Sequence, residues 1–149
     1  MEPLKVAEIK ITYSTNVRPS ERFKIKQSLD CYNLFIKMWD KEKIEFVEEF
    51  KVMLLNRANK VLGVVDISTG GVSGTVADPK VIFVAALKAN ASGIVLAHNH
   101  PSGNLTASTQ DLNLTKKLRA GGEILDISVL DHLILTTEGY TSFADDGLI

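Results

Sequence analysis

The chain of 149 residues has few or none of several features that mark whole classes of protein. It has one cysteine, Cys31, so no internal disulfide can form, and a reducing cytoplasm is the expected compartment. The formal net charge is −1, which gives no general attraction for nucleic acid or for an anionic membrane. No apolar run approaches the ~20 residues of a membrane-spanning helix. The first residues also lack the apolar core of a signal peptide. We therefore expect a cytoplasmic globular protein.

The first 43 residues are predicted to form a strand and a helix that pack on a main domain of residues 44–149. Apolar and polar side chains alternate over Ile9–Tyr13, which is typical of a half-buried strand. A helix is expected from Ser28 to about Trp39. Its apolar stripe is suited to core packing and consists of Leu29, Tyr32, Phe35, Ile36 and Trp39. Cys31 lies in this helix and is interpreted as a small buried hydrophobe rather than a reactive thiol.

Strand-like and helix-like segments mix without strict alternation in residues 44–149. This mixture favours an α/β fold with a mixed central sheet flanked by helices. The strand-like runs are Phe50–Leu55, Val61–Val65 after the hairpin turn Asn56–Asn59, Val72–Val76, Ile94–Ala97, Asp126–Leu130, Leu133–Thr136 and Tyr140–Phe143.

Two helices are predicted between these strands. The first begins at Asp78-Pro79, since aspartate is a good N-cap and proline suits the first helical turn, and it runs to about Ala91. The second runs from Ser108 to about Ala120, where Gly121-Gly122 is expected to end it. The packing side of the first helix is predicted to be Val81, Val84, Ala85 and Leu87.

Two of the three histidines lie in one tripeptide, His98-Asn99-His100, at the end of the apolar run 93–97. Residues two apart in a strand point to the same face, so both imidazoles are expected to point one way. Pro101 cannot continue the strand, and the turn-forming residues after it return the chain toward Asp111. Two imidazoles and a carboxylate can then bind a metal ion and leave a fourth tetrahedral position for water.

Asp111 can be interpreted as a metal ligand or as part of a helix cap. Ser108-Thr109-Gln110-Asp111 is similar to a capping box, in which Ser108 caps the helix and Asp111 favours its positive end. The two interpretations are partly compatible, because a helix start anchored by Ser108 can aim a first-turn carboxylate at a metal ion. Asp126 and Asp131 are rival carboxylates that the spacing alone does not exclude.

The types of ligand narrow the choice of metal ion and of the reaction that it could support. The sequence has neither His-Glu-x-x-His of helical zinc peptidases nor Pro-Cys-x-x-Cys of zinc deaminases. Two imidazoles and one carboxylate suit Zn2+, with non-haem iron as the competitor. A hydrolytic zinc site also needs a carboxylate that takes a proton from the bound water. Glu45, Glu48 and Glu49 precede a predicted strand, and the residues alone do not tell which of them turns inward.

The motif and its flanking sequences resemble the JAMM (JAB/MPN) metalloprotease family, and within it the RadC-type JAB domain. The motif is His98-x-His100, then seven residues, then Ser108-x-x-Asp111, with a glutamate upstream. The flanking matches are Glu48-Glu49-Phe50, Leu54 to Asn59, Ala97 to Asn104 and Leu130 to Ile134. The resemblance covers roughly residues 44–149.

The resemblance implies a three-layer, cytidine-deaminase-like fold and zinc-dependent hydrolysis of peptide or isopeptide bonds in an unidentified substrate. It implies that Ser108 hydrogen-bonds the zinc-bound water and the oxyanion. The family's catalytic glutamate precedes a phenylalanine at the start of a strand, which selects Glu49 over Glu48 as general base. The zinc ligands implied by the resemblance are His98, His100 and Asp111.

The chain also departs from parts of the family. Asn99 stands where deubiquitinating members carry serine or threonine, which is usual for the RadC branch. Longer RadC relatives have an N-terminal helix-hairpin-helix region, for which these 149 residues leave no room. The near-neutral charge gives no support to the DNA-repair role linked to that branch. The branch nevertheless supplies the alternative function, which is a RadC-like, DNA-associated module with an idle or structural metal site.

Asp131-His132 lies between two apolar runs and has two interpretations. The pair could orient the metal ligands from behind. The sequence favours the other interpretation, in which His132 lies at a sheet edge with its ring bound to a local backbone group.

Overall fold

A computed structural model of the chain describes residues 4–71 and 76–149. Its centre is one five-stranded sheet with the strand order β2-β1-β3-β4-β5. The strands are β1 (Glu49–Leu55), β2 (Val61–Thr69), β3 (Gly93–Asn99), β4 (Ser128–Leu135) and β5 (Tyr140–Ser142). The pair β3–β4 is parallel and the other neighbouring pairs are antiparallel, so the predicted mixed sheet is confirmed. The predicted run at Val72–Val76 falls largely on residues 72–75, which lie outside the described residues.

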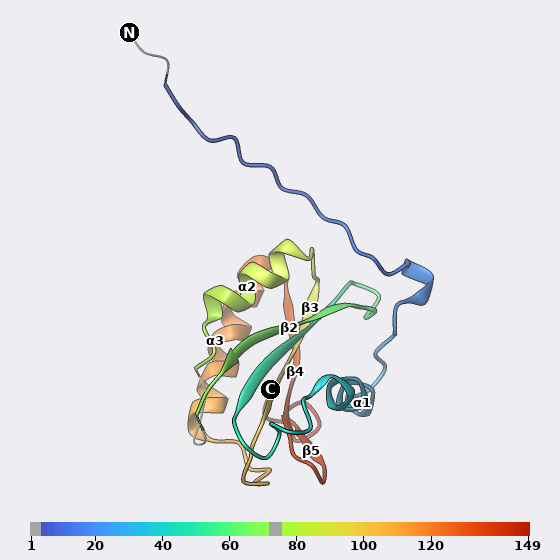
Figure 1. The fold of residues 1–149 in the computed structure, drawn as a ribbon, viewed down its shortest axis with the longest axis vertical. Helices are drawn as coiled ribbons and strands as arrows, with labels where there is room; N and C mark the ends of the chain where they lie inside the picture. Colours follow the sequence, from blue (N-terminus) through green and yellow to red (C-terminus); the bar gives the residue numbers. More distant parts are fainter. Residues whose placement is uncertain (1–3, 72–75) are drawn as a thin grey trace.

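Helices cover both faces of the sheet and make three layers (Figure 1). Helix α1 (Ser28–Met38), which follows the short 3-10 helix η1 (Pro19–Glu21), lies on one face. Helices α2 (Pro79–Lys88) and α3 (Thr109–Leu125) lie on the other. Within the described residues, no helix has both the length and the apolar character needed to cross a membrane.

Each buried strand supplies two cores, because alternate side chains point to opposite faces. In β1, Val52 and Leu54 join the cluster under α2 and α3, while Met53 and Leu55 join the cluster under α1. The α1 cluster includes Phe35 and Trp39, so the predicted core packing of the aromatic stripe is confirmed for both rings. This alternation matters for the site, because it decides which residues at the strand ends share a face.

The β1–β2 hairpin turn is confirmed at Asn56–Asn59. The Asn56 side-chain oxygen accepts hydrogen bonds from the backbone N–H groups of Ala58 (3.0 Å) and Lys60 (2.9 Å). Asn59 has a φ of 59°, a left-handed conformation that asparagine tolerates better than most residues. Two asparagines therefore give the turn its shape.

The predicted strand at Ile9–Tyr13 is wrong. These residues are extended but lie outside every strand, and Ile9 and Ile11 are 85% and 95% exposed. Alternation provides a strand with an apolar face, but the strand also needs a neighbour with which to pair. The described part of this chain offers none to these residues.

The packing side predicted for α2 is also wrong. Ile82 and Ala86 are its buried residues, whereas Val81, Val84 and Leu87 are largely exposed. The helix is apolar on nearly all sides, so helical periodicity cannot distinguish its inner from its outer face. It ends at Lys88 rather than near Ala91.

Helix α3 continues past Gly121-Gly122, where it was predicted to end. It ends at Leu125, and Asp126 adopts a left-handed cap conformation with φ 55°. Gly122 is needed for a close approach inside the helix, because a Cβ there would lie 2.2 Å from the carbonyl oxygen of Ile127. The runs predicted as two strands on either side of Asp131-His132 form one strand, β4, that buries this polar pair.

We predict a measurable effect of the buried Cys31 on stability at high pH. Burial, followed by the charges of Asp131 and Asp30, raises the pKa of the Cys31 thiol from its ordinary 9.0 to about 12. Below pH 9.0 the thiol is neutral in both folded and unfolded chains. Above it only the unfolded chain ionises, so the free energy of unfolding should fall with rising pH, by at most ~1.4 kcal/mol per pH unit.

Urea unfolding of the wild type and of Cys31→Ala across this alkaline range measures the effect. The wild type should lose stability more steeply above pH 9.0, because Cys31→Ala has no thiol to ionise. Parallel curves, or rapid labelling of the native thiol at neutral pH, would contradict the buried neutral thiol.

Candidate metal centre

His98 and His100 lie at the carboxyl end of β3, and their rings point the same way, as predicted. Their Nε2 atoms are 3.0 Å apart and their ring centroids 4.8 Å apart. His98 is 1% exposed and lies opposite Phe50 of β1, whose ring stacks on it at 5.9 Å with parallel planes. The site is therefore built on the interior of the sheet, with one histidine in the core and one at its rim.

Asn99, between the two histidines, points to the opposite face and fixes the segment that leads into β1. Its side-chain nitrogen donates to the backbone carbonyls of Ile44 and Val47, each at 2.8 Å. Its side-chain oxygen accepts from the backbone N–H of Glu49 at 2.7 Å. The alternation of β3 thus gives the histidines to one face and a clamp for the glutamate segment to the other.

Asp111 has both of the roles considered from the sequence. Its Oδ2 accepts from the backbone N–H of Ser108, and the Ser108 hydroxyl accepts from the backbone N–H of Asp111, each at 3.0 Å. The same Oδ2 lies 3.4 Å from His98 Nε2 and 3.6 Å from His100 Nε2. The capping box at the start of α3 therefore aims this carboxylate at the two imidazoles.

The rival carboxylates lie elsewhere. Asp126 is at the other end of α3, as its C-cap. Asp131 accepts hydrogen bonds from the Ser142 hydroxyl (2.6 Å) and from the backbone N–H groups of Ala144 (2.9 Å) and His132 (2.7 Å). Neither side chain is among the groups around His98 and His100.

The structure does not bring the predicted general base, Glu49, to the histidines. Its carboxylate lies 3.7 Å from Lys51 Nζ, which in turn lies 5.0 Å from the Trp39 ring on the α1 face. Glu48 Oε1 instead lies 3.8 Å from His100 Nε2. Glu48, His98 and His100 offer ligand atoms that all lie within 4.8 Å of one another, which could hold a metal ion. The structure thus places Glu48, rather than Glu49, beside the histidines, and which glutamate acts as general base stays a prediction.

The alternation of side chains along β1 explains why Glu48, and not Glu49, lies near the histidines. Residues directly opposite in an antiparallel pair point to the same side, and Phe50 is opposite His98. The glutamate on the histidine face is then two residues before Phe50, not one. Predicting this from the sequence would have required the β1–β3 register.

His132 contacts the site histidine His98 from behind, a position that the preferred sequence interpretation did not give it. It lies in β4, which has β3 and β5 as neighbours, and it is 0% exposed. Its Nε2 is 2.7 Å from His98 Nδ1, and its Nδ1 is 2.7 Å from the Thr115 hydroxyl. The predicted sheet-edge position and backbone contact are wrong. Of the pair, His132 contacts the site histidine, whereas Asp131 fixes the loop after β5.

The hydrogen-bond partners fix the protonation of the three rings. The Thr115 hydroxyl donates to the carbonyl oxygen of Asp111 at 2.8 Å, so it must accept from His132 Nδ1. Burial, followed by the charge of His98, lowers the pKa of His132 well below its usual value, so its ring is neutral. His132 Nε2 then accepts from His98 Nδ1, so in the neutral form of His98 the lone pair lies on Nε2, which faces the site.

The same reasoning applies to His100. Its Nδ1 lies 2.5 Å from the carbonyl oxygen of Asn104, which can only accept, so Nδ1 carries the proton. In its neutral form the ring therefore presents an Nε2 lone pair toward Asp111 Oδ2. Burial alone would raise the pKa of Asp111, but hydrogen bonds from the Nε2–H groups that His100 and His98 carry when protonated outweigh it and hold that pKa far below its usual range. A hydrogen bond to Asp111 raises the pKa of His100 in turn.

His98 Nε2, His100 Nε2 and Asp111 Oδ2 thus converge, and each offers a lone pair when the two rings are neutral and the carboxylate is ionised. Such a cluster is unfavourable unless a cation or a proton lies among the three atoms. The rings have their donor nitrogens fixed from behind, which is the arrangement found around metal-binding histidines. The residues present therefore fit a metal ion.

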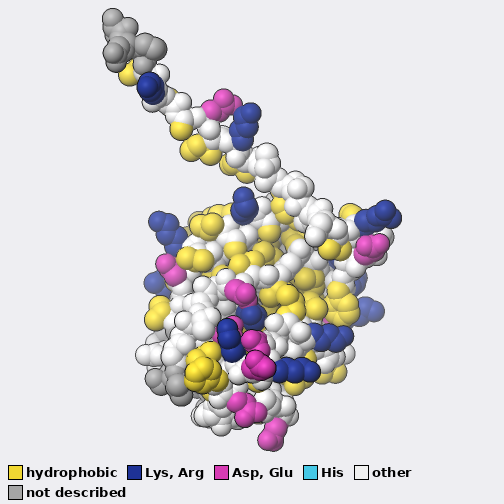
Figure 2. Space-filling view, viewed as in Figure 1, with side chains coloured by type: hydrophobic (Ala, Val, Ile, Leu, Met, Phe, Trp, Pro, Cys, Tyr) yellow, Lys and Arg dark blue, Asp and Glu magenta, His cyan; other side chains and the backbone are white. Residues whose placement is uncertain are grey.

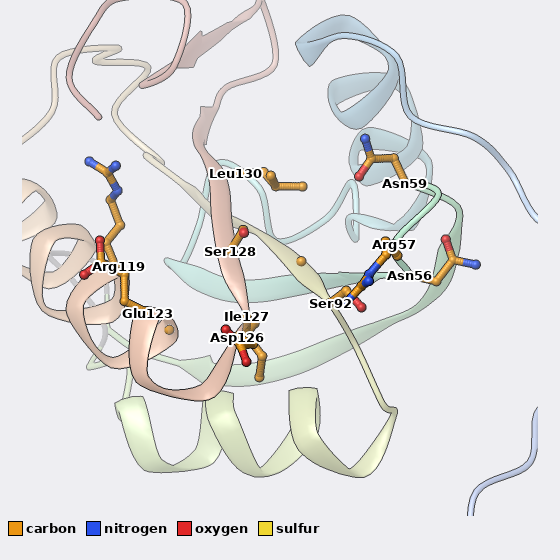
Figure 3. A pocket seen from close by; sticks show the side chains of 12 residues that line it. Asn56, Arg57, Asn59, Ser92, Arg119, Glu123, Asp126, Ile127, Ser128 and Leu130 are labelled. Carbon is orange, nitrogen blue, oxygen red and sulfur yellow. The ribbon is translucent and has the colours of Figure 1, made fainter.

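A cavity of about 590 Å³ opens over this cluster, and Ser108 also lines it. The other lining residues are Glu48, Phe50, Val76, Ala77, His98, His100, Pro101, Ser102, Asn104, Gln110, Asp111 and Leu114. A second cavity, of about 640 Å³, lies at the opposite end of the sheet near Ser92 and Ser128 (Figure 3). There Arg119 comes from α3 and Arg57 from the β1–β2 hairpin, and the rival carboxylate Asp126 also lines this cavity.

The fold and the site together define a class: a three-layer α/β domain with a histidine–carboxylate cluster that could hold a metal ion at the carboxyl end of a central strand. The chain belongs to the RadC-like JAB domain family, which matches residues 25–148. The match includes α1, and the domain boundary predicted near residue 44 stays a prediction.

Several relatives of the chain have the name UPF0758 protein. The protein from Flavobacterium johnsoniae is 48% identical over 101 residues, which are 68% of this chain and 44% of the relative. That from Symbiobacterium thermophilum is 41% identical over 103 residues, 69% of this chain and 44% of the relative. That from Syntrophotalea carbinolica is 31% identical over 154 residues, 99% of this chain and 66% of the relative. The matches to the first two cover less than half of each relative.

We predict that Thr115 fixes the histidine protonation pattern. Thr115→Val removes the acceptor for His132 Nδ1–H in a fully buried position, which should lower the free energy of unfolding by about 1–3 kcal/mol. Thr115→Ser keeps the hydroxyl and should lose less. Urea unfolding measures the stabilities, and nitrogen NMR of the rings should show His98 and His132 protonated on Nδ1 in the wild type. A proton on His98 Nε2 at neutral pH, or a Thr115→Val chain as stable as the wild type, would contradict this account.

Proposed function

We propose that the chain is a zinc-dependent hydrolase of peptide or isopeptide bonds, with His98, His100 and Asp111 as the zinc ligands. The observation that carries the proposal is the convergence of His98 Nε2, His100 Nε2 and Asp111 Oδ2 within 3.6 Å beneath an open cavity. Two imidazoles and one carboxylate suit zinc and leave a position for water. Membership of the JAB family agrees with this chemistry.

Bound zinc supplies an activated water and a Lewis acid for the carbonyl. The protein's own contribution begins with Glu48. Its carboxylate is on the same face as the histidines and lines the cavity, where it can take a proton from water and pass it to the leaving amine. Its position beside the three proposed ligands supports Glu48 as the general base.

Ser108 is proposed to stabilise the oxyanion that develops on the scissile carbonyl. Its oxygen already accepts from the backbone N–H of Asp111, and its hydroxyl proton can be donated into the cavity that the side chain lines. A donor of this kind contributes ~3–4 kcal/mol to transition-state stabilisation in well-studied hydrolases. His132 acts through His98 as a positioning residue, since its hydrogen bond holds the tautomer that presents Nε2 to the metal.

We predict that Glu48→Gln slows hydrolysis and that Glu49→Gln does not. Glu48→Gln should retain zinc and cleave a proteome-derived peptide library at least ~10²-fold more slowly, because it cannot accept a proton. Glu49→Gln is the matched control, since the same change occurs on the other face of the sheet, and it should cleave like the wild type. Mass spectrometry of the zinc-loaded chains with the library measures the rates.

Two outcomes would count against the proposal. If only Glu49→Gln loses cleavage, Glu49 and not Glu48 is the general base. A wild-type chain that carries zinc and cleaves none of the peptides, whether linear or isopeptide-linked, would contradict hydrolysis itself while leaving the metal site intact.

A further inference from the structure

We propose that residues Val6–Tyr13 form a strand that pairs with the β2 edge of a second copy of this chain, in a reciprocal strand-exchanged dimer. The N-terminal segment leaves the domain as an extended chain and points away from it (Figure 1). Ala7, Ile9, Ile11 and Tyr13 share one face of such a strand, and the other face has Glu8, Lys10 and Thr12 together with Val6 at its start. This is the pattern of a strand with one face buried.

The observed exposure contradicts that pattern unless a partner is present. Val6, Ile9 and Ile11 are 83%, 85% and 95% exposed. No backbone hydrogen bond joins residues 4–13 to the rest of the described chain. An extended apolar segment with unpaired N–H and C=O groups is a template for sheet pairing.

The complementary surface is the outer edge of β2. This nine-residue strand pairs with β1 on one side and ends the sheet on the other. The chain covers only the start of that edge, where Val61 N–H donates to the Phe23 carbonyl (2.8 Å) and Ile25 N–H donates to the Asn59 carbonyl (2.9 Å). Toward the N-terminus from Phe23, the chain turns away from β2 at helix η1. Residues 62–69 therefore keep an uncovered edge in the described structure.

An apolar groove runs beside the uncovered edge. A cavity of about 520 Å³ is lined by Leu62 and Val65 of β2, by Ala85 and Ala89 at the end of α2, and by residues 12–15 of the N-terminal segment. Figure 2 shows apolar side chains gathered below this segment on the same side of the molecule. Apolar side chains of a pairing strand would enter this surface as its backbone joins the edge.

A second copy fits this surface better than the chain's own segment. Residues 12–15 already cross the groove, and the residues before them have passed the domain and extend into solvent. Residues 6–13 and 62–69 are equal in length. Each copy has one such segment and one such edge, so a two-fold exchange satisfies both and closes the assembly.

Sedimentation analysis of the full chain at high micromolar concentration tests the dimer. The wild type should sediment as two chains, and Ile9→Asp/Ile11→Asp should sediment as one. Lys10→Asp changes the net charge by the same amount on the opposite face of the segment, and it should remain a dimer. Ile9 and Ile11 are 85% and 95% exposed in the single chain, so the variants should still fold.

Hydrogen exchange and mixed-label NMR identify what the segment contacts. In the dimer, amides of residues 6–13 and of the outer β2 edge should exchange at least about tenfold more slowly than in Ile9→Asp/Ile11→Asp. Isotope-filtered contacts should connect Ile9 or Ile11 of one copy with β2 of the other. A monomeric wild type would overturn the proposal, whether its segment is disordered or is folded onto its own β2. A dimer whose contacts omit residues 6–13 would overturn it as well.

Discussion

The hydrogen bond between His98 Nδ1 and His132 Nε2 joins the candidate site to the core of the protein. It crosses from β3 to β4 in the interior of the sheet, and it continues through Thr115 to the backbone of Asp111 at the start of α3. A strand, its parallel neighbour and a helix are thus connected by side chains with one consistent set of proton positions. The site histidine cannot rotate or change tautomer without leaving a buried polar group unsatisfied.

The alternation of β3 gives the end of this strand two separate tasks. His98 points toward α3 and the cavity, while Asn99 points toward the α1 side and holds the segment before β1. Asn99 also binds the backbone N–H of Glu49, so Glu48 is held just before the strand on the face of the histidines. The ligand cluster and the proposed base are therefore positioned from opposite faces of the same strand end.

Most of the α/β fold follows from local patterns, and so do the positions of His98, His100 and Asp111 relative to one another. The histidine pair needs only the two-residue period of a strand, and the capping box needs only four consecutive residues. The structure places Glu48 rather than Glu49 beside the histidines, and this could not be predicted because the face of a glutamate depends on the register between β1 and β3, which no local pattern contains. His132 was misplaced because its partner is 34 residues away in sequence and lies on another strand.

The errors outside the site have related causes. Asp131-His132 was expected to separate two strands, because a polar pair is costly to bury. In β4 both side chains have buried partners, so the strand continues through them. The N-terminal segment shows the opposite situation: Ile9–Tyr13 has a strand pattern but no partner in its own chain. Pairing is a property of two segments, and a single-segment pattern cannot predict whether the second is available.

Metal analysis tests the central claim most directly. The account predicts about one zinc per chain in protein purified without chelators or metal-affinity resin. Asp111→Asn should lose most of that zinc, whereas Asp126→Asn, at the other end of α3, should keep it. A wild-type chain that holds no metal and gains no thermal stability when zinc is added would contradict a metal site at His98, His100 and Asp111.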